Sequence, residues 1–415
     1  MSSQSSGIGD PLRSHRLVAG WSQEQLADEA GVSVSVVRKL EKGGRARVEP
    51  LRRLARALGV TTAQLFAAGA PAPVVGDEST RQALMSLRQV LMPPVGVEKT
   101  LIDPGEAGVA TDLWQQIDDG QALYHADRYE SVSRMLPDLL RAAEAAVSVA
   151  EDELERHEAA AMRSRALLLS GKYLTQVRQY DMAYHALAEG IRVARDIDDK
   201  AGAATGVVGM CWLLLRQDRF DDAEKLATVT ASQVEPRFSS ASAGELALWG
   251  ELSLRIAAAA VRNNRPDVSS DARRMAATAA SALNQEHTDY RQHWSRFGPV
   301  TAELKAVEDL GLAEDYRGVL RRADDGILAS RALEEFGTPS SINWNRHRLD
   351  VAQAHVRLGS TQDAMDELSR IKRTAGNWIK HQPMARDIME DVLKGRKRSL
   401  TMEMRSMAAH IGVHS

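Results

Sequence analysis

The stretch of residues 21–43 constrains the fold of this chain more than any other. Ser22 and Gln25 have the spacing of a capping box, in which two side chains satisfy free N–H groups at the start of a helix. Gly31 supplies the left-handed turn that a residue with a Cβ atom resists. Ser33 is suited to cap the next helix. The stretch therefore predicts two short helices joined by a tight turn.

The second of these helices has an apolar inner side and a polar outer side. A DNA-recognition helix needs such an outer side, because its short polar and basic side chains must reach base edges and phosphates in a groove about 12 Å wide. The pattern favours a DNA reader over its alternative, an ordinary helical hairpin with a solvated basic face. The inner and outer sets are Val36, Val37 and Leu40, and Ser35, Arg38 and Lys39, respectively.

Further short helices are expected on either side of this pair. One is predicted over Pro11–Ala19 and another over Pro50–Leu58, which ends at Gly59. Thr61 and Gln64 form a second capping box that leads into a fifth helix. Five short helices in one segment predict a compact all-α domain.

With these residues in place, the segment Leu12–Phe66 resembles the lambda-repressor-like (XRE) helix-turn-helix family. The resemblance is sharp over this segment, because many positions agree in one order. The matching positions are Gly20, Ser22, Gln23, Leu26, Ala27, Ala30, Gly31, Val32, Ser33, Leu40, Glu41, Lys42, Gly43 and residues 54–60.

The resemblance also implies roles for single residues. Glu41 would hold the domain together, and Gln23 would approach a phosphate or a neighbouring recognition side chain. Val34 departs from the polar residue common in the family, so that a thymine methyl contact replaces a polar one. Arg45 and Arg47 lie where the family often has Pro-Ser, and we expect them to contact backbone phosphate. The implied DNA-binding set is Gln23, Ser33, Val34, Ser35, Arg38, Lys39, Arg45 and Arg47.

The charge of the chain is unevenly distributed. Residues 1–70 contain ten Lys and Arg against six Asp and Glu, although the whole chain has a net charge of −3. Positive charge is thus concentrated on the predicted DNA reader, as in a modular regulator. A length of 415 residues allows two or three domains.

Cysteine usage and hydropathy point to the cytoplasm. Cys211 is the single cysteine, so no disulfide framework exists. The first ten residues lack the basic start and apolar core of a signal peptide, and no apolar run approaches the roughly 18 residues of a membrane span. We therefore expect a cytoplasmic protein without a membrane partner.

The sequence offers no support for enzyme activity. It contains no glycine-rich phosphate loop, no His-Glu-x-x-His motif and no Gly-x-Ser-x-Gly motif. His287, Asp289 and His293 lie close along the chain, but we expect a polar loop there rather than a metal site. The expectation is no catalytic residue, no metal and no cofactor.

Four segments are predicted along the chain. Residues 1–9 form a disordered arm and residues 10–69 the DNA-binding domain. Residues 70–110 are a linker with one helix over 77–91, and residues 111–415 are helical almost throughout. The predicted fold class is all-α, with a five-helix lambda-repressor-like domain followed by a TPR-like α-solenoid.

Residues 111–415 contain a weak internal repeat. Small, apolar, aromatic and small residues recur at offsets of 0, 3, 9 and 12, because a small residue is needed where two helices cross and an aromatic one fills the groove between them. Two fainter units follow. The clear units are Gly120, Leu123, Tyr129 and Val132; Gly171, Leu174, Tyr180 and Ala183; and Cys211, Leu214, Phe220 and Ala223. The fainter ones are Ala257, Ala260, Pro266 and Ser269, and Ala352, His355, Ala364 and Leu368.

This pattern resembles tetratricopeptide (TPR) repeats, and its alternative is a general α-helical bundle. An XRE reader followed by a TPR-like array resembles the RRNPP class of bacterial regulators. That class implies a homodimer on palindromic double-stranded DNA and an intracellular signalling peptide in the groove of the array, as in quorum sensing. A small molecule in the same cavity is the neighbouring possibility.

Candidate ligand residues follow from side-chain chemistry. Asn amides can hydrogen-bond to a ligand as both donor and acceptor, and Trp can cover an apolar group. The candidates are Trp212, Asn263, Trp294, Asn343, Asn345 and Arg346. Two other functions stay open: a protein-interaction scaffold whose helix-turn-helix does not bind DNA, and a dimeric repressor that needs no ligand.

Overall fold

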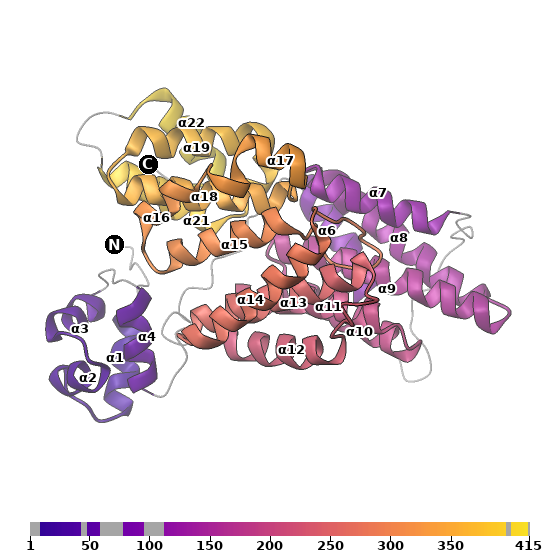
Figure 1. The fold of residues 1–415 in the computed structure, drawn as a ribbon, viewed down its shortest axis with the longest axis horizontal. Coiled ribbons are helices and arrows are strands. Elements are labelled where there is room, and N and C mark those ends of the chain that lie inside the picture. Colours follow the sequence, from indigo (N-terminus) through magenta and orange to yellow (C-terminus); the bar gives the residue numbers. More distant parts are fainter. Residues whose placement is uncertain (1–8, 43–47, 59–77, 95–111, 396–399, 414–415) are drawn as a thin grey trace.

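The computed structural model describes residues 9–42, 48–58, 78–94, 112–395 and 400–413. Within these ranges the secondary structure is helical, with one isolated antiparallel bridge between His287 and Phe297. The all-α class predicted from the sequence is therefore confirmed. Figure 1 shows a small N-terminal group of helices beside a much larger helical body.

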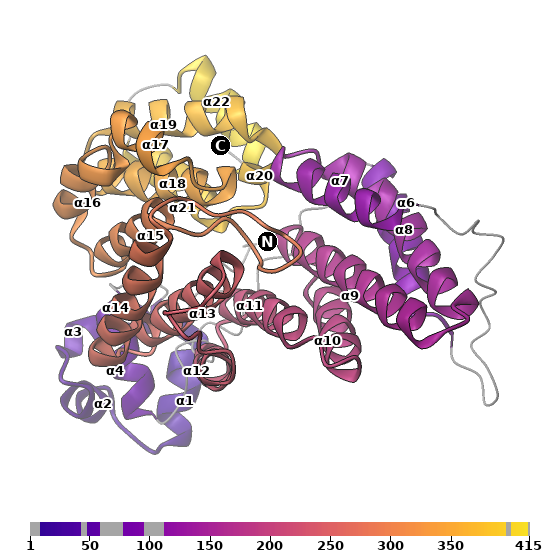
Figure 2. The same ribbon diagram turned by 45° about the vertical axis from the view of Figure 1, so that its right-hand side comes forward.

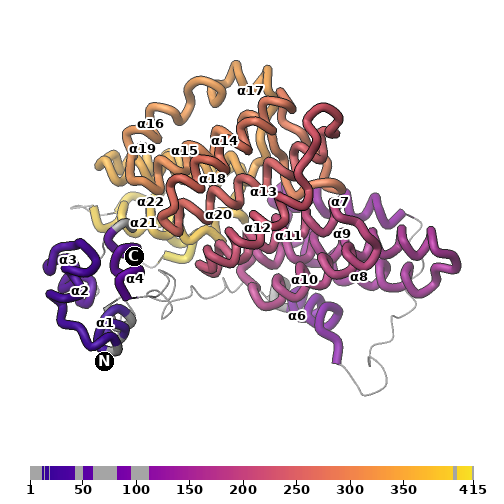
Figure 3. Tube along the Cα trace, turned by 60° about the horizontal axis from the view of Figure 1, so that its bottom comes forward, coloured from indigo at the N-terminus to yellow at the C-terminus, as the bar shows by residue number. Residues whose placement is uncertain are grey.

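Within the described residues, the small group, here called the head, has four short helices around one core. Figure 3 shows these helices side by side. They are α1 (Gly9–Val18), α2 (Gln23–Ala30), α3 (Val34–Glu41) and α4 (Val48–Ala57). Each of the four helices contributes fully or nearly fully buried apolar residues to this core, namely Leu12, Leu26, Ala27, Ala30, Val37, Leu40, Leu51, Leu54 and Ala55. The predicted fifth helix and the predicted N-terminal arm lie outside the described residues, apart from Gly9.

The larger body begins with α6 (Glu78–Leu91), which is the helix predicted over residues 77–91 and which packs against α8. The rest of the body, here called the array, runs from α7 to α22. Its helices are α7 (Leu113–His125), α8 (Tyr129–Val149), α9 (Glu153–Gln176), α10 (Tyr180–Asp196), α11 (Lys200–Arg216), α12 (Phe220–Gln233), α13 (Ala243–Arg262), α14 (Pro266–Leu283), α15 (Pro299–Leu312), α16 (Tyr316–Arg322), α17 (Ser330–Phe336), α18 (Ser341–Arg357), α19 (Thr361–Thr374), α20 (Gly376–Lys380), α21 (Pro383–Gly395) and α22 (Met402–Ile411).

Six helical hairpins of the array share one kind of turn. In each, three residues join two helices, and the middle residue has a positive φ. The aromatic residues of the clear repeat units, Tyr129, Tyr180 and Phe220, each begin the second helix of their hairpin. The weak sequence repeat therefore marks a repeated structural unit. The middle residues of the turns are Asp127, Arg178, Asp218, Asn264, Glu314 and Gly359.

The first helices of successive hairpins pack on one another, from α7 through α9, α11, α13 and α15 to α18. Small residues allow the close approach that the repeat predicted. A Cβ atom on Gly120 would lie 2.7 Å from a methyl carbon of Leu169, and one on Gly171 would lie 2.5 Å from Cγ of Leu187. Membership of the TPR family stays a prediction.

The two ends of the array meet. The carboxylate of Asp127, in the first turn, accepts hydrogen bonds from the backbone N–H groups of Asn377 and Trp378 at the start of α20, both at 2.7 Å. The hydroxyl of Ser341 donates to the carbonyl of His125 at 2.7 Å. Figure 2 shows α20 beside α7 accordingly. The array is thus closed into a ring rather than left as an open groove.

Residues 284–298, between α14 and α15, cross the first helices and place two aromatic side chains against them. Trp294 (5 % exposed) and Phe297 (fully buried) cover Gly209 on α11 and Gly250 on α13, where a Cβ atom would overlap the aromatic rings. The loop predicted around His287, Asp289 and His293 is confirmed, since residues 284–292 join two helices without helical structure and are exposed or half-buried. The end of the segment differs, because Trp294 and Phe297 enter the core where two glycines leave room for their rings.

Gly250→Ala should destabilise the array by about 1–3 kcal/mol, because the added methyl group overlaps the buried ring of Phe297. Gly311→Ala is the matched control: its nearest neighbour, Val319, would be 3.8 Å away, so the variant should gain up to about 1 kcal/mol of helix propensity. Urea unfolding followed by far-UV circular dichroism measures both. Equal stabilities of the two variants would contradict the packing described here.

Candidate functional site

The outer side of α3 is free in the structure. Ser33, Ser35, Arg38 and Lys39 are exposed, whereas Val34 is half-buried against the head core. Val37 and Leu40, on the opposite side, are fully buried. The apolar and polar sides thus lie as the helical spacing predicts, and the outer side can approach a duplex. Arg45 and Arg47 lie outside the described residues.

The turn between α2 and α3 has the expected local geometry with one difference. Ser22 and Gln25 form the full capping box, and Gly31 ends α2 with φ of 62°. Ser33 is the N-cap residue of α3, but its side chain makes no capping hydrogen bond. Its hydroxyl lies 2.9 Å from that of Ser35 instead, which keeps both hydroxyls at the exposed N-terminal turn of α3.

A buried ion pair fixes α3 on the rest of the head. The guanidinium of Arg16 on α1 donates to both carboxylate oxygens of Glu41, at 2.6 and 3.1 Å. The amide of Gln23 on α2 donates to the same carboxylate at 2.6 Å. Burial by itself would raise the pKa of Glu41, but the hydrogen bonds from Arg16 and Gln23 and the charge of Arg16 lower it below its ordinary value. Glu41 therefore joins three helices.

Arg38 is held only loosely. Its guanidinium donates to Glu24 at 2.8 Å and to the side-chain oxygen of Gln23 at 3.4 Å. The Arg38 and Glu24 side chains are 58 % and 55 % exposed, and an ion pair in such a setting contributes little to stability because water and salt screen it. Arg38 can therefore exchange Glu24 for a phosphate or a base at little cost.

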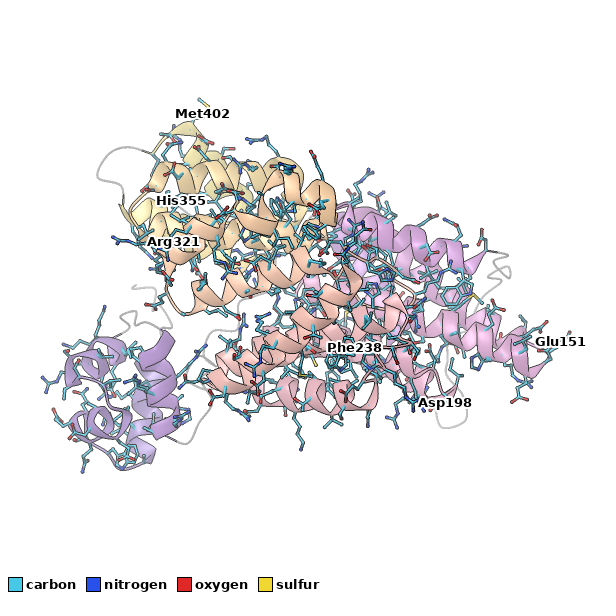
Figure 4. The ribbon with its side chains drawn as sticks, in the orientation of Figure 1. Glu151, Asp198, Phe238, Arg321, His355 and Met402 are labelled. Carbon is cyan, nitrogen blue, oxygen red and sulfur yellow. The ribbon has the colours of Figure 1, made fainter. Side chains whose placement is uncertain are left out.

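A second candidate site is a cavity of about 210 Å³ at the centre of the ring, far larger than the roughly 10–15 Å³ that one water molecule needs. Its walls come mainly from the first helices of the hairpins, α7, α9, α11, α13, α15 and α18, and from the crossing segment. Side chains at the array's outer edge, such as Glu151 and Asp198, point away from this centre (Figure 4). We call it the central cavity.

Four of the six residues predicted to bind a ligand line the central cavity: Trp212, Trp294, Asn343 and Arg346. The other two do not. Asn263 lies in the turn between α13 and α14, where its amide donates to Asp221 and Glu224 at 3.0 and 3.1 Å. Asn345 is buried on α18 and is not part of the cavity wall.

Apart from Arg346, the charged residues of this wall were not predicted from the sequence. A single cation in an otherwise apolar stretch of a first helix was the available signal, as in SGKYL, LLLR and LSLRIAAAA. The missed cations are Lys172, Arg216, Arg255, Arg262, Arg296 and Lys305, and the missed carboxylates are Glu251 and Glu308.

The wall residues near α15 and α18 neutralise one another. The carboxylate of Glu308 lies 2.9 Å from Nζ of Lys305, 3.3 Å from a guanidinium nitrogen of Arg262 and 3.8 Å from one of Arg346. Arg346 also lies 3.4 Å from Asp350. Burial raises the pKa of Glu308, but the three surrounding cations lower it well below its ordinary value.

Lys172 occupies a different setting on the opposite wall. Its ammonium donates to the side-chain oxygen of Gln121 at 2.9 Å and to the carbonyl of Trp294 at 2.6 Å. It also lies over the rings of Trp294 and Tyr290, 4.7 and 5.1 Å from their centres. Burial lowers the pKa of Lys172 to about 7, despite the attraction of Glu251.

Another recess lies between the head and the array. Arg52 and Arg56 of α4 line it together with Asp218 in the α11–α12 turn, Asp221 at the start of α12 and residues of the α13–α14 turn. Arg262, at the end of α13, lines both this recess and the central cavity. One side chain thus borders both the cavity and the surface that faces the head.

Within the described parts of the chain, no helix combines the length and the apolar character that crossing a bilayer requires. The sequence model of the helix-turn-helix family matches residues 12–65. No curated protein matches the chain. The N-terminal region is therefore an XRE-type helix-turn-helix domain, and the rest of the described chain is helical. The match indicates a DNA-binding transcription regulator.

Proposed function

We propose that this protein is a sequence-specific transcription regulator that binds double-stranded DNA as a homodimer and responds to a signal bound in its array. The observation that carries the proposal is the exposed outer side of α3, fixed from behind by the ion pair between Arg16 and Glu41. Short polar and basic side chains on a rigid helix are what major-groove reading requires.

The homodimer is proposed from the energetics of DNA recognition. One short recognition helix buries too little surface for tight, specific binding. Two such helices held about 34 Å apart read a palindrome, and each half-site then adds to the affinity of the other. The array is the proposed dimerisation element, because it makes up most of the chain.

The central cavity and Arg262 support the sensing part of the proposal. A ligand that changes how Arg262 pairs with Glu308 also changes a side chain of the recess that faces α4. Ligand binding would then shift the population between two placements of the head. By linkage, DNA and ligand must change each other's affinity by the same factor. The closed ring favours a small molecule over an extended peptide.

Arg38→Ala combined with Lys39→Ala should weaken DNA binding about 100-fold, because each base or phosphate interaction of these side chains is worth about 1–3 kcal/mol. The salt dependence should flatten as well, since the slope falls by about 1 for each phosphate that the variant no longer neutralises. Fluorescence anisotropy on fragments that the wild-type protein selects from genomic DNA measures both quantities. Sedimentation of the complex gives its stoichiometry.

Arg192→Ala with Lys200→Ala is the matched control, because both side chains are exposed on the array and the change in net charge is the same. It should leave affinity and slope unchanged. Equal affinities of the two double variants would reject the proposed reading helix. If the wild-type protein selects no fragment even at low salt, the chain is a scaffold with a helix-turn-helix that does not bind DNA.

A further inference from the structure

We propose that the central cavity is a binding site for a small organic oxyanion, a phosphate or carboxylate group on a compact body, which Arg216 and Arg255 hold by its charge. This inference rests on the proposed sensor role of the array and names the chemical class of its ligand. The neighbouring possibility, an extended peptide, is an outcome of the test below.

The first argument is the charge of the wall. Seven cationic side chains line the cavity and only two carboxylates do. Four of the cations come from α11, α13 and α15, which are consecutive first helices of the ring. An excess of one sign in a low-dielectric cavity attracts the opposite charge. The cations are Lys172, Arg216, Arg255, Arg262, Arg296, Lys305 and Arg346, and the carboxylates are Glu251 and Glu308.

The second argument is that two buried guanidinium groups lack a counter-ion. Among the described residues, neither Arg216 nor Arg255 has a carboxylate oxygen within 4.0 Å. Arg216 donates only to the neutral side chain of Gln382, at 3.3 Å, and lies over the ring of Trp212. Nε of Arg255 is buried without a hydrogen-bond partner. A buried charge is costly unless it is paired, so an anionic ligand in the cavity that both side chains line would explain both groups.

Both carboxylates of the wall are already engaged, and Glu308, which also attracts Arg255, is paired with Lys305. Glu251 attracts both Lys172 and Arg255 electrostatically. Its carboxylate nevertheless accepts the backbone N–H of Trp294 at 2.8 Å and lies 3.6 Å from Nδ1 of His293. Because burial outweighs this attraction, the pKa values of Lys172 and Arg255 lie below their ordinary values. Burial also lowers the pKa of Arg216, to about 10.

Further polar atoms of the wall also lack partners. The donors Nε1 of Trp378 and Nε of Arg346 are buried and make no hydrogen bond within the described structure. The same holds for the ring of His125, which burial keeps neutral, with one donor and one acceptor nitrogen. Buried polar atoms are almost always hydrogen-bonded in folded proteins. A concentration of unpartnered donors around one cavity is the arrangement that a multidentate acceptor, such as a phosphate or a carboxylate, would satisfy.

The remaining wall defines the body of the ligand. Trp212, Trp294, Trp378 and Tyr124 surround the cavity with aromatic surface, which suits a compact apolar or ring-shaped group. The bonds from Asp127 to the start of α20 close the ring, and a cavity of about 210 Å³ suits a compact ligand better than a long extended chain. Cations together with aromatic walls describe a small amphiphilic anion.

Three probes of similar size test whether binding needs the negative charge or only the aromatic ring. They are phenyl phosphate, benzoate and the neutral benzyl alcohol. Isothermal titration calorimetry and thermal melting of the full chain are run at constant ionic strength. A probe concentration of about 10 mM fills roughly 90 % of a site whose Kd is about 1 mM. One or both anions should release heat and raise Tm by about 2–4 °C, and benzyl alcohol should do neither.

Arg216→Met with Arg255→Met should weaken binding of the active anion at least tenfold. The same variant should melt at a higher temperature than the wild type without a probe, because it removes two unpaired buried charges and keeps the volume of the side chains. If the two cations served only to stabilise the fold, the double variant would instead melt at a lower temperature than the wild type. Arg274→Met, whose side chain is 71 % exposed on α14, is the control and should change neither value.

The outcomes separate this inference from the proposed function. Binding of either anion, abolished in the double variant, supports the oxyanion site, and the stronger probe identifies phosphate or carboxylate. The absence of heat and of a Tm shift with both anions overturns it, and so does equal binding of benzyl alcohol. An unstructured anionic peptide is titrated as a fourth probe, and binding of this peptide alone would also overturn the inference. DNA affinity of the same preparation is measured alongside. If DNA binds and no anion does, only the oxyanion site fails and a ligand-independent repressor remains.

Discussion

Glu41→Ala is expected to unfold the head and abolish DNA binding while the array stays folded. The substitution leaves the guanidinium of Arg16, on a residue only 7 % exposed, buried without its carboxylate, and it also removes the acceptor of Gln23. Breaking a buried ion pair from one side costs about 3–5 kcal/mol. A domain of this size has a total stability of roughly 3–9 kcal/mol, so most of it would disappear.

Limited proteolysis and circular dichroism measure this effect, because cleavage should be confined to the head and the main thermal transition should stay in place. Glu24→Ala is the control: it breaks only the exposed pair with Arg38 and should leave the stability of the head nearly unchanged. Arg16→Met combined with Glu41→Leu should recover much of the stability, since neither variant residue leaves a buried charge. If Glu41→Ala resists protease as well as Glu24→Ala does, the network does not hold the head together.

Trp294→Ala is expected to destabilise the array by about 3–5 kcal/mol, the usual cost of removing a large buried aromatic side chain. The indole is 5 % exposed, covers Gly209 and lies under the ammonium of Lys172. Its removal leaves a void between the crossing segment and α11, and it takes away the ring that partly compensates a buried charge. The void also merges with the central cavity, so binding of any anion there should weaken.

Urea unfolding of the array gives the stability of this variant. Trp114→Ala is the control, because that indole is half-buried and lies between Arg291 and Glu158 near the start of the array. It should cost no more than about 2 kcal/mol, in proportion to its smaller buried surface. The head carries its own core, so both variants should keep wild-type affinity for DNA. Equal destabilisation at positions 294 and 114 would show that the crossing segment is not packed as described.

The head could be predicted in detail from the sequence. Its signals are local: the capping box at Ser22, the glycine turn at Gly31 and the helical spacing of Val37 and Leu40 act over a few residues. Such signals fix short helices and the sides they bury. The hydrogen bond between Gln23 and Arg38 followed only from the family resemblance, because no local rule links these positions.

The repeated hairpins were visible in the sequence, but the site they build was not. Gly120 and Tyr129 mark a crossing and a helix start, which are again local properties. The cations of the central cavity lie on different helices, and nothing in the spacing of Lys172 and Arg255 shows that both face one space. Their meeting depends on how each hairpin rotates against the next.

The closure of the ring could not be predicted from the sequence either. Asp127 and Trp378 are joined by a hydrogen bond although 251 positions separate them, and small rotations at every intervening hairpin add up to bring them together. Local residue patterns therefore determined the helices, the turns and the exposed polar side of α3. Only the tertiary structure decided that the array encloses a cationic cavity, because burial and charge pairing are properties of the whole packed chain.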